Sequence, residues 1–112
     1  MRKVESGQYE DAIPQFDLVI RGLPILAQAY YGRGVAFIKQ EQKQEELGLA
    51  DLNKAIELKA DYAEAYHERG ALLIRQDKTD AGTADLRQAL ELYEADNNET
   101  GAAEIRQLLE GS

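Results

Sequence analysis

One internal repeat constrains the fold of this 112-residue chain more than any other feature of its sequence. Residues 27–40 (AQAYYGRGVAFIKQ) resemble residues 63–76 at an offset of 36 positions. Residues 48–58 (GLADLNKAIEL) resemble residues 82–92 at an offset of 34 positions. A two-segment unit has therefore been duplicated, and only the linker inside it differs, by two residues. A period of this length is typical of helical repeat proteins.

Composition excludes several classes of protein. The chain has no cysteine, which excludes disulfides and thiolate metal sites, and its 44% hydrophobic and 30% charged residues are ordinary for a globular protein. The most apolar window, residues 22–38, contains Pro24 and Arg33 and falls short of a bilayer span. The N-terminus lacks the apolar core of a secretory signal. We expect a soluble, cytoplasmic protein that is not inserted in a membrane.

Charge is concentrated in the second half of the chain. Residues 57–112 carry 13 Asp and Glu against 6 Lys and Arg, whereas residues 1–56 are nearly neutral. An acidic surface repels phosphate backbones, so nucleic acid is not expected as a partner. The acidic half is either a solvated face or a surface that attracts a basic peptide.

Apolar residues recur at three- and four-residue spacing, and no stretch alternates as a strand does. The pattern predicts an all-α chain with helices at about 8–21, 25–40, 47–58, 61–76, 79–93 and 99–110. Pro14 places the start of the first helix near Tyr9 to Asp11, because proline is tolerated only in a first turn. Residues 1–6 are too few to form a stable helix alone. Asp61 with Glu64 resembles a capping box, and residues 96–98 break the chain before the last helix.

The repeated residues resemble those of the tetratricopeptide repeat family. In one unit the pattern is carried by six residues and in the next by their equivalents: Tyr30, Gly34, Phe37, Gly48, Leu52 and Ala55, then Tyr66, Gly70, Leu73, Gly82, Leu86 and Ala89. An earlier partial unit matches at Ala12, Phe16, Val19 and Pro24. The resemblance implies an α-α superhelix, a right-handed solenoid of antiparallel helix pairs. It divides a single domain of residues 1–112 into a partial repeat (1–24), two repeats (25–60 and 61–96) and a C-terminal capping helix (97–112).

The partial unit lacks nearly all of its first helix. The helix that contains Phe16 and Val19 would then expose apolar area at one end of the solenoid. The chain is accordingly either a piece of a longer protein, or a homo-oligomer formed through its N-terminal end, or simply frayed there.

Arginine and aspartate recur at equivalent sites, as Arg33 with Asp51 and Arg69 with Asp85. A pair that repeats with the unit predicts a structural ion pair rather than catalysis. His67, the single histidine, lacks the second histidine of a zinc-protease helix, and no phosphate-binding loop follows a strand. The sequence predicts no enzyme activity, no metal site and no cofactor.

The resemblance implies a concave groove, lined by the first helices of successive units, that binds a peptide or protein partner. Carried onto this chain, its lining is Gln28, Tyr31, Val35, Ile38, Lys39, Glu64, His67, Ala71, Ile74 and Arg75. Tyr31 and His67 stand where a basic clamp for a C-terminal carboxylate would need cations, so that mode is not expected. The chain is predicted to be an interaction or scaffold module. A regulatory segment of a larger enzyme or signalling protein, or a self-associating oligomer, is the alternative.

Overall fold

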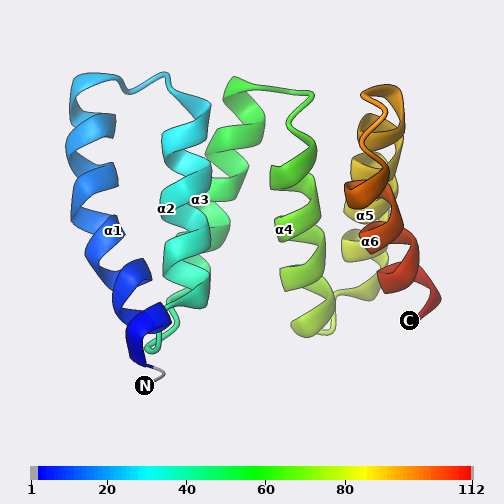
Figure 1. Cartoon of the computed structure of the whole chain (residues 1–112), viewed down its shortest axis with the longest axis horizontal. Helices are drawn as coiled ribbons and strands as arrows, with labels where there is room; N and C mark the ends of the chain where they lie inside the picture. Colours follow the sequence, from blue (N-terminus) through cyan, green and yellow to red (C-terminus); the bar gives the residue numbers. More distant parts are fainter. Residues whose placement is uncertain (1–2, 112) are drawn as a thin grey trace. The chain divides into compact units, whose positions relative to one another are not determined.

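A computed structural model describes residues 3–111, with side chains described from Gly7 onward. This part of the chain is helical throughout apart from its short connections, and it contains no strand. The helices are α1 (Lys3–Gly22), α2 (Ala27–Lys39), α3 (Glu45–Leu58), α4 (Ala63–Arg75), α5 (Thr79–Ala95) and α6 (Glu99–Glu110) (Figure 1). The all-α prediction is confirmed, and five of the six predicted helices begin and end within about two residues of their expected bounds.

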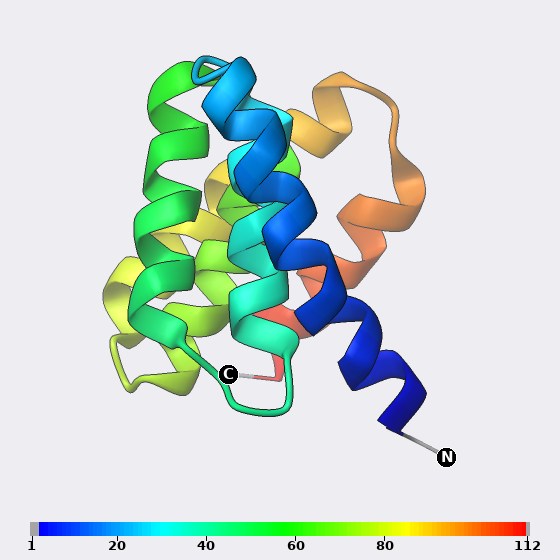
Figure 2. The same cartoon turned by 90° about the vertical axis from the view of Figure 1, so that its left-hand side faces the viewer.

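Contacts divide the chain into two compact units. Unit 1 ends at Ala60 and contains α1–α3, and unit 2 begins at Asp61 and contains α4–α6. In unit 1, α2 packs against both α1 and α3, and Figure 2 shows α1 running along α2. In unit 2, α5 packs against both α4 and α6. The single domain expected from the sequence and its division into repeats stay predictions, although each helix lies inside its expected segment.

The two central hairpins, α2–α3 and α4–α5, cross at paired glycines. A Cβ on Gly34 would lie 3.0 Å from the carbonyl oxygen of Gly48, and one on Gly70 would lie 2.9 Å from that of Gly82. Backbones that approach this closely leave no room for a side chain at the crossing. The cost of glycine in a helix interior, about 1 kcal/mol relative to alanine, is therefore offset by packing.

Each unit has its own buried core next to this crossing. Leu52 and Ala55 of α3 are fully buried in unit 1, and Leu86 and Ala89 of α5 are their equivalents in unit 2. Unit 2 extends its core to α6, where Ala102 and Ile105 are also fully buried. The repeated Leu and Ala positions of the second helices are thus buried in both units.

The turns of the two hairpins differ by the two residues seen in the sequence. The α4–α5 turn, residues 76–78, closes with Asp77 in the left-handed region at φ 65° and a bond from the Lys78 N–H to the Leu73 carbonyl of 2.8 Å. This is the arrangement that ends many helices. The longer α2–α3 turn, residues 40–44, instead closes with the Gln44 N–H donating to the Phe37 carbonyl at 2.9 Å.

The first helix starts earlier than the sequence indicated. α1 begins at Lys3, so Pro14 lies inside the helix and the prediction of a start near Tyr9 to Asp11 is wrong. Pro14 and Glu10 are both exposed, so water can satisfy the carbonyl that loses its backbone partner. Adding turns to an existing helix also needs no new nucleation, so residues 3–6 are helical as an extension although they could not be alone. Met1 and Arg2 lie outside the described residues.

Helix capping was predicted correctly at one end and wrongly at another. Asn98 caps α6, its Oδ1 accepting a 3.0 Å hydrogen bond from the Gly101 N–H, as expected from the break at residues 96–98. At α4, however, the N-cap position is occupied by Tyr62, which makes no side-chain capping bond. Tyr62 is buried, and burying its ring fixes where the chain enters α4, one residue later than Asp61 would set it.

Candidate functional site

The repeated Arg and Asp residues form one ion pair inside each unit. Arg33 donates from Nε and Nη2 to both carboxylate oxygens of Asp51, each at 2.8 Å. Arg69 donates in the same way to Asp85, at 2.7 and 2.9 Å. These hydrogen bonds raise the pKa of each guanidinium above its ordinary value, against the opposing effect of burial. The prediction of structural pairs is confirmed.

The two arginines also lie over equivalent tyrosine rings on the first helices of their hairpins. Arg33 lies over the ring of Tyr30 at 5.8 Å, and Arg69 lies over the ring of Tyr66 at 5.5 Å. In unit 1, Arg33 also lies over the ring of Phe37 at 5.9 Å and donates to Asp17 of α1 at 2.8 Å. The duplication seen in the sequence therefore extends to side-chain geometry.

The α2 face carries five of the predicted groove residues. Gln28 and Lys39 are exposed, and Tyr31 and Val35 are half-buried. Ile38 departs from the prediction, since it is only 3% exposed and packs where α2 meets Gly48 of α3. Its side chain belongs to the core of unit 1 and cannot line a groove.

The α4 face carries the other five, and four of them line cavities within unit 2. One cavity of about 320 Å³ is lined by His67, Glu104, Gln107 and Leu108. A second cavity of about 280 Å³ is lined by Ala71, Ile74, Arg75, Leu86 and Leu108. Both include Leu108, and we call the two together the α4–α6 hollow. Glu64, the fifth residue, is exposed one turn before His67.

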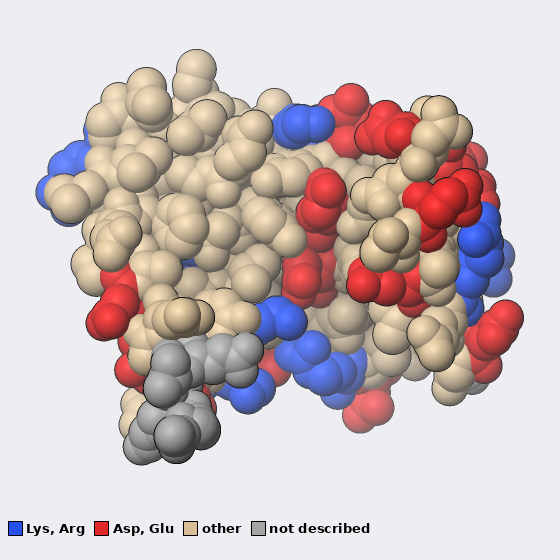
Figure 3. Space-filling view, in the orientation of Figure 1, with Lys and Arg blue, Asp and Glu red and all other residues tan. Residues whose placement is uncertain are grey.

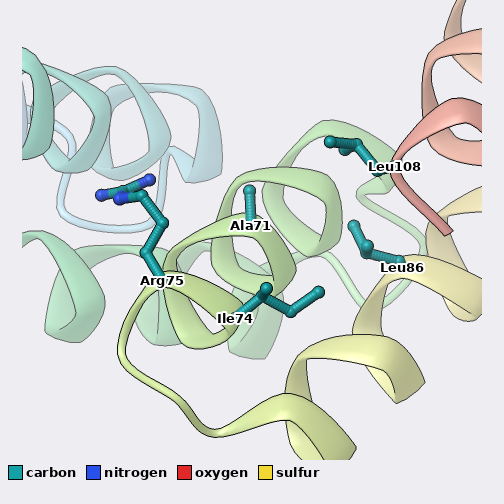
Figure 4. A pocket seen from close by; sticks show the side chains of 5 residues that line it. All are labelled: Ala71, Ile74, Arg75, Leu86 and Leu108. Carbon is teal, nitrogen blue, oxygen red and sulfur yellow. The ribbon is translucent and has the colours of Figure 1, made fainter. Parts of the chain in front are cut away.

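Figure 4 shows how the second cavity is formed. Ile74 of α4, Leu86 of α5 and Leu108 of α6 direct their side chains into the same space, with Ala71 beside them on α4. Arg75 extends away from Leu86 and Leu108. Leu108 is 41% exposed although it lies on a helix whose Ile105 is fully buried. Such a space, apolar inside and open to solvent, suits one apolar side chain of a partner.

The other cavity has a polar, negatively charged environment. His67 Nδ1 lies 3.1 Å from the hydroxyl of Tyr93, and the two rings meet edge to face at 5.9 Å. Tyr93 is 4% exposed, and its burial, together with the charges of Glu64, Glu104 and Glu68, raises its pKa to about 12. The α4 and α6 carboxylates thus act on the same small region of unit 2.

Three residues of the hollow were not predicted as site residues: Glu104, Gln107 and Leu108, all on α6. Leu108 follows Ala102 and Ile105 at three-residue spacing, and this apolar pattern by itself predicts that Leu108 lies on the core-facing side of the capping helix. The available signal was that residues 104, 107 and 108 share one face at three- and four-residue spacing. Figure 3 shows that acidic side chains gather on the visible surface of unit 2 and are sparse on that of unit 1.

The described part of the chain lacks two other kinds of functional feature. Residues 3–111 contain no group of three or more His, Cys, Asp or Glu that could hold a metal ion. Over the same residues, no helix has both the length and the apolar character required to cross a membrane.

Tandem helical hairpins that cross at paired glycines and repeat an Arg–Asp pair define a helical repeat protein. A model of the tetratricopeptide repeat matches residues 63–96, which cover α4 and α5. The chain is 36% identical over 94 residues to the DnaJ homolog subfamily C member 3 of Bos taurus, which covers 84% of this chain. It is 33% identical over 92 residues to the human tetratricopeptide repeat protein 13, covering 80% of this chain. Residues 63–96 therefore form a tetratricopeptide repeat, and most of the chain is similar to parts of larger tetratricopeptide repeat proteins.

A solved structure agrees with this assignment. The crystal structure of the P58(IPK) TPR domain matches 96% of this chain with a TM-score of 0.71 and 30% identity. The fold class is therefore the all-α solenoid of such domains. The chain spans 18% of the cattle DnaJ homolog, 11% of the human repeat protein and 30% of the P58(IPK) chain, so it resembles only a part of each.

Proposed function

We propose that this chain is a non-catalytic interaction module, and that unit 2 binds a peptide segment of a protein partner in the α4–α6 hollow. The repeat fold supports a protein-interaction scaffold in general, and the hollow is the observation that carries the specific proposal. Four residues expected from the sequence on α4 meet α5 and α6 residues around two cavities that share Leu108. An extended peptide anchored by side-chain contacts fits such a surface.

The α2 face is a second, separate part of the proposal. Gln28, Tyr31, Val35 and Lys39 remain accessible on unit 1, and we propose that they contact the partner as well. A cytoplasmic location, expected from the sequence, stays a prediction.

Replacing Leu108 with serine is expected to weaken peptide binding about tenfold. Leu108 borders both cavities, and removing a half-buried leucine contact costs about 1.4 kcal/mol of binding free energy. Random dodecapeptides displayed on phage and selected on the immobilised chain supply the probes, and fluorescence anisotropy measures their affinity. Leu47→Ser is the matched control, because Leu47 is 50% exposed on α3 and lines neither cavity. Equal affinity for all three proteins would exclude the hollow as the binding site.

Two alternatives have observations of their own. The fraction of each relative that this chain spans favours a regulatory or accessory segment of a larger protein, and an adjoining catalytic domain in the full-length gene would establish that. Self-association is favoured by four exposed apolar side chains in unit 1, on α1 and the turn after it: Leu18, Val19, Leu23 and Ile25, which are 39–77% exposed.

If that patch joins two copies, the sedimentation coefficient should rise with protein concentration between about 10 and 300 µM. Replacing Leu18 and Ile25 together with serine should abolish the rise, because these two are the most exposed of the four. A monomer at every concentration would exclude self-association through this end.

A further inference from the structure

Charge around the α4–α6 hollow is divided between its two ends. Glu64 and Glu68 lie on α4 within one turn of His67, and Glu104 faces them from α6 in the wall of the same cavity. All three contribute to the negative potential felt by the buried hydroxyl of Tyr93. Among the described residues none of the three forms a salt bridge. Their charge is therefore available to a ligand.

The cavity at the other end differs in character. Its walls are Ala71, Ile74, Leu86 and Leu108, and Arg75 is the charged residue of its lining. A carboxylate bound here would gain only from Arg75, whereas an apolar side chain would contact Ala71, Ile74 and Leu108 above the buried Leu86. The two ends therefore prefer different side chains of one ligand, a cation near His67 and an apolar group near Ile74.

The spacing of these two ends limits the ligand further. His67 and Ile74 are seven residues apart on α4, which corresponds to about 10 Å along a helix axis. An extended peptide advances about 3.3 Å per residue. Its cationic and apolar side chains would then be about three positions apart.

We propose that the α4–α6 hollow selects extended peptides in which a lysine or arginine lies about three positions from a large apolar residue. The carboxylates of Glu64, Glu68 and Glu104 pair with the cation, and the space between Ile74, Leu86 and Leu108 takes the apolar side chain. This inference rests on the proposed function and names the chemistry of its partner. An acidic peptide is disfavoured, because its carboxylates would face three others at the His67 end.

The test uses the full chain and the same phage-displayed dodecapeptides. Peptides whose binding depends on Leu108 should be enriched in Lys or Arg three positions from Leu, Ile, Met or Phe. In a synthetic copy of the best binder, changing that basic residue to glutamate should weaken binding at least tenfold. Raising NaCl from 50 to 500 mM should weaken the original peptide and leave the glutamate version nearly unchanged, because salt screens the pairing of exposed charges.

The second part of the test reverses a charge in the protein instead of in the peptide. Glu104→Lys should weaken the basic peptide about fivefold and strengthen its glutamate version. Glu91→Lys makes the same charge change at an exposed α5 residue that lines neither cavity, and its effect should stay below twofold. Leu108-dependent peptides without a basic residue, or equal effects of the two variants, would overturn this inference and leave the proposed function intact. An absence of any Leu108-dependent peptide would overturn both.

Discussion

Replacing Asp85 with alanine is expected to lower the free energy of unfolding by about 3 kcal/mol, among the largest effects we expect from a single substitution. The Asp85 side chain is 11% exposed and accepts two hydrogen bonds from Arg69, whose side chain is 23% exposed. Without the carboxylate, a mostly buried guanidinium loses both of these bonds, and the ring of Tyr66 beneath it cannot supply a full negative charge. The cost comes from burying that cation without the carboxylate, more than from the attraction itself. Urea unfolding followed by circular dichroism measures it.

The equivalent substitution in unit 1 provides an internal comparison. Asp51→Ala should cost a comparable amount, about 3 kcal/mol, because Arg33 loses the same two hydrogen bonds to its carboxylate. Glu94→Ala is the exposed control, since Glu94 and Arg106 form an ion pair in which both side chains are 48% exposed, and such pairs contribute less than about 1 kcal/mol. If Asp85→Ala and Glu94→Ala are equally mild, the repeated pair is not what holds α4 to α5.

The repeat made this pair predictable. A single Arg and Asp 16 or 18 residues apart carry no information about contact, but two such pairs at the same unit positions require one explanation for both. The helices were predictable for a similar reason, because the same apolar spacing occurs twice. The start of α1 was predicted wrongly, and its N-terminal extension past Pro14 has no equivalent in the other units.

The site was predictable only in part, because a periodic pattern does not show where the core ends and the surface begins on a helix. Ile38 and Ile74 are equivalent in sequence, yet Ile38 is 3% exposed and Ile74 is half-buried at the wall of a cavity. Leu108 deviates in the opposite direction, since it was expected in the core and is 41% exposed. Residues at the edge of an apolar face can contact either a neighbouring helix or a ligand. Which of these occurs depends on the neighbouring helices, and the pattern does not contain that information.

Unit 2 therefore combines a rigid part and an accessible part. The α4–α5 crossing at Gly70 and Gly82 fixes α4, and the packing of α6 on α5 around Tyr93 and Gly101 fixes the other wall. The hollow lies between walls that are each held by close backbone contact or a buried aromatic ring. A ligand then meets a surface that is already formed, which reduces the entropy lost on binding.

The glycine crossing leads to the second large effect, a loss of about 2 kcal/mol of stability for Gly82→Ala. Alanine is the better helix former by about 1 kcal/mol, so on propensity alone the substitution should stabilise the protein. Steric crowding reverses the expected sign of the stability change. The added Cβ would lie 2.8 Å from the carbonyl oxygen of Gly70 and 3.0 Å from the amide nitrogen of Ile74. Both are backbone atoms, so α4 itself would have to move, and overpacking of this kind costs about 1–3 kcal/mol beyond the propensity gain.

Gly7→Ala is the matched control, because Gly7 also lies inside a helix, but a Cβ there would meet nothing within 4 Å among the described residues. That substitution should raise the free energy of unfolding by up to about 1 kcal/mol, and the urea midpoint should rise with it. Gly48→Ala, whose Cβ would lie 2.9 Å from the Gly34 carbonyl oxygen, should follow Gly82→Ala. The decisive observation is that the stability change at Gly7 has the opposite sign to the changes at Gly82 and Gly48. If alanine stabilises the protein at all three positions, the helices do not approach as closely as described, and the hollow built on that crossing would lose its fixed α4 wall.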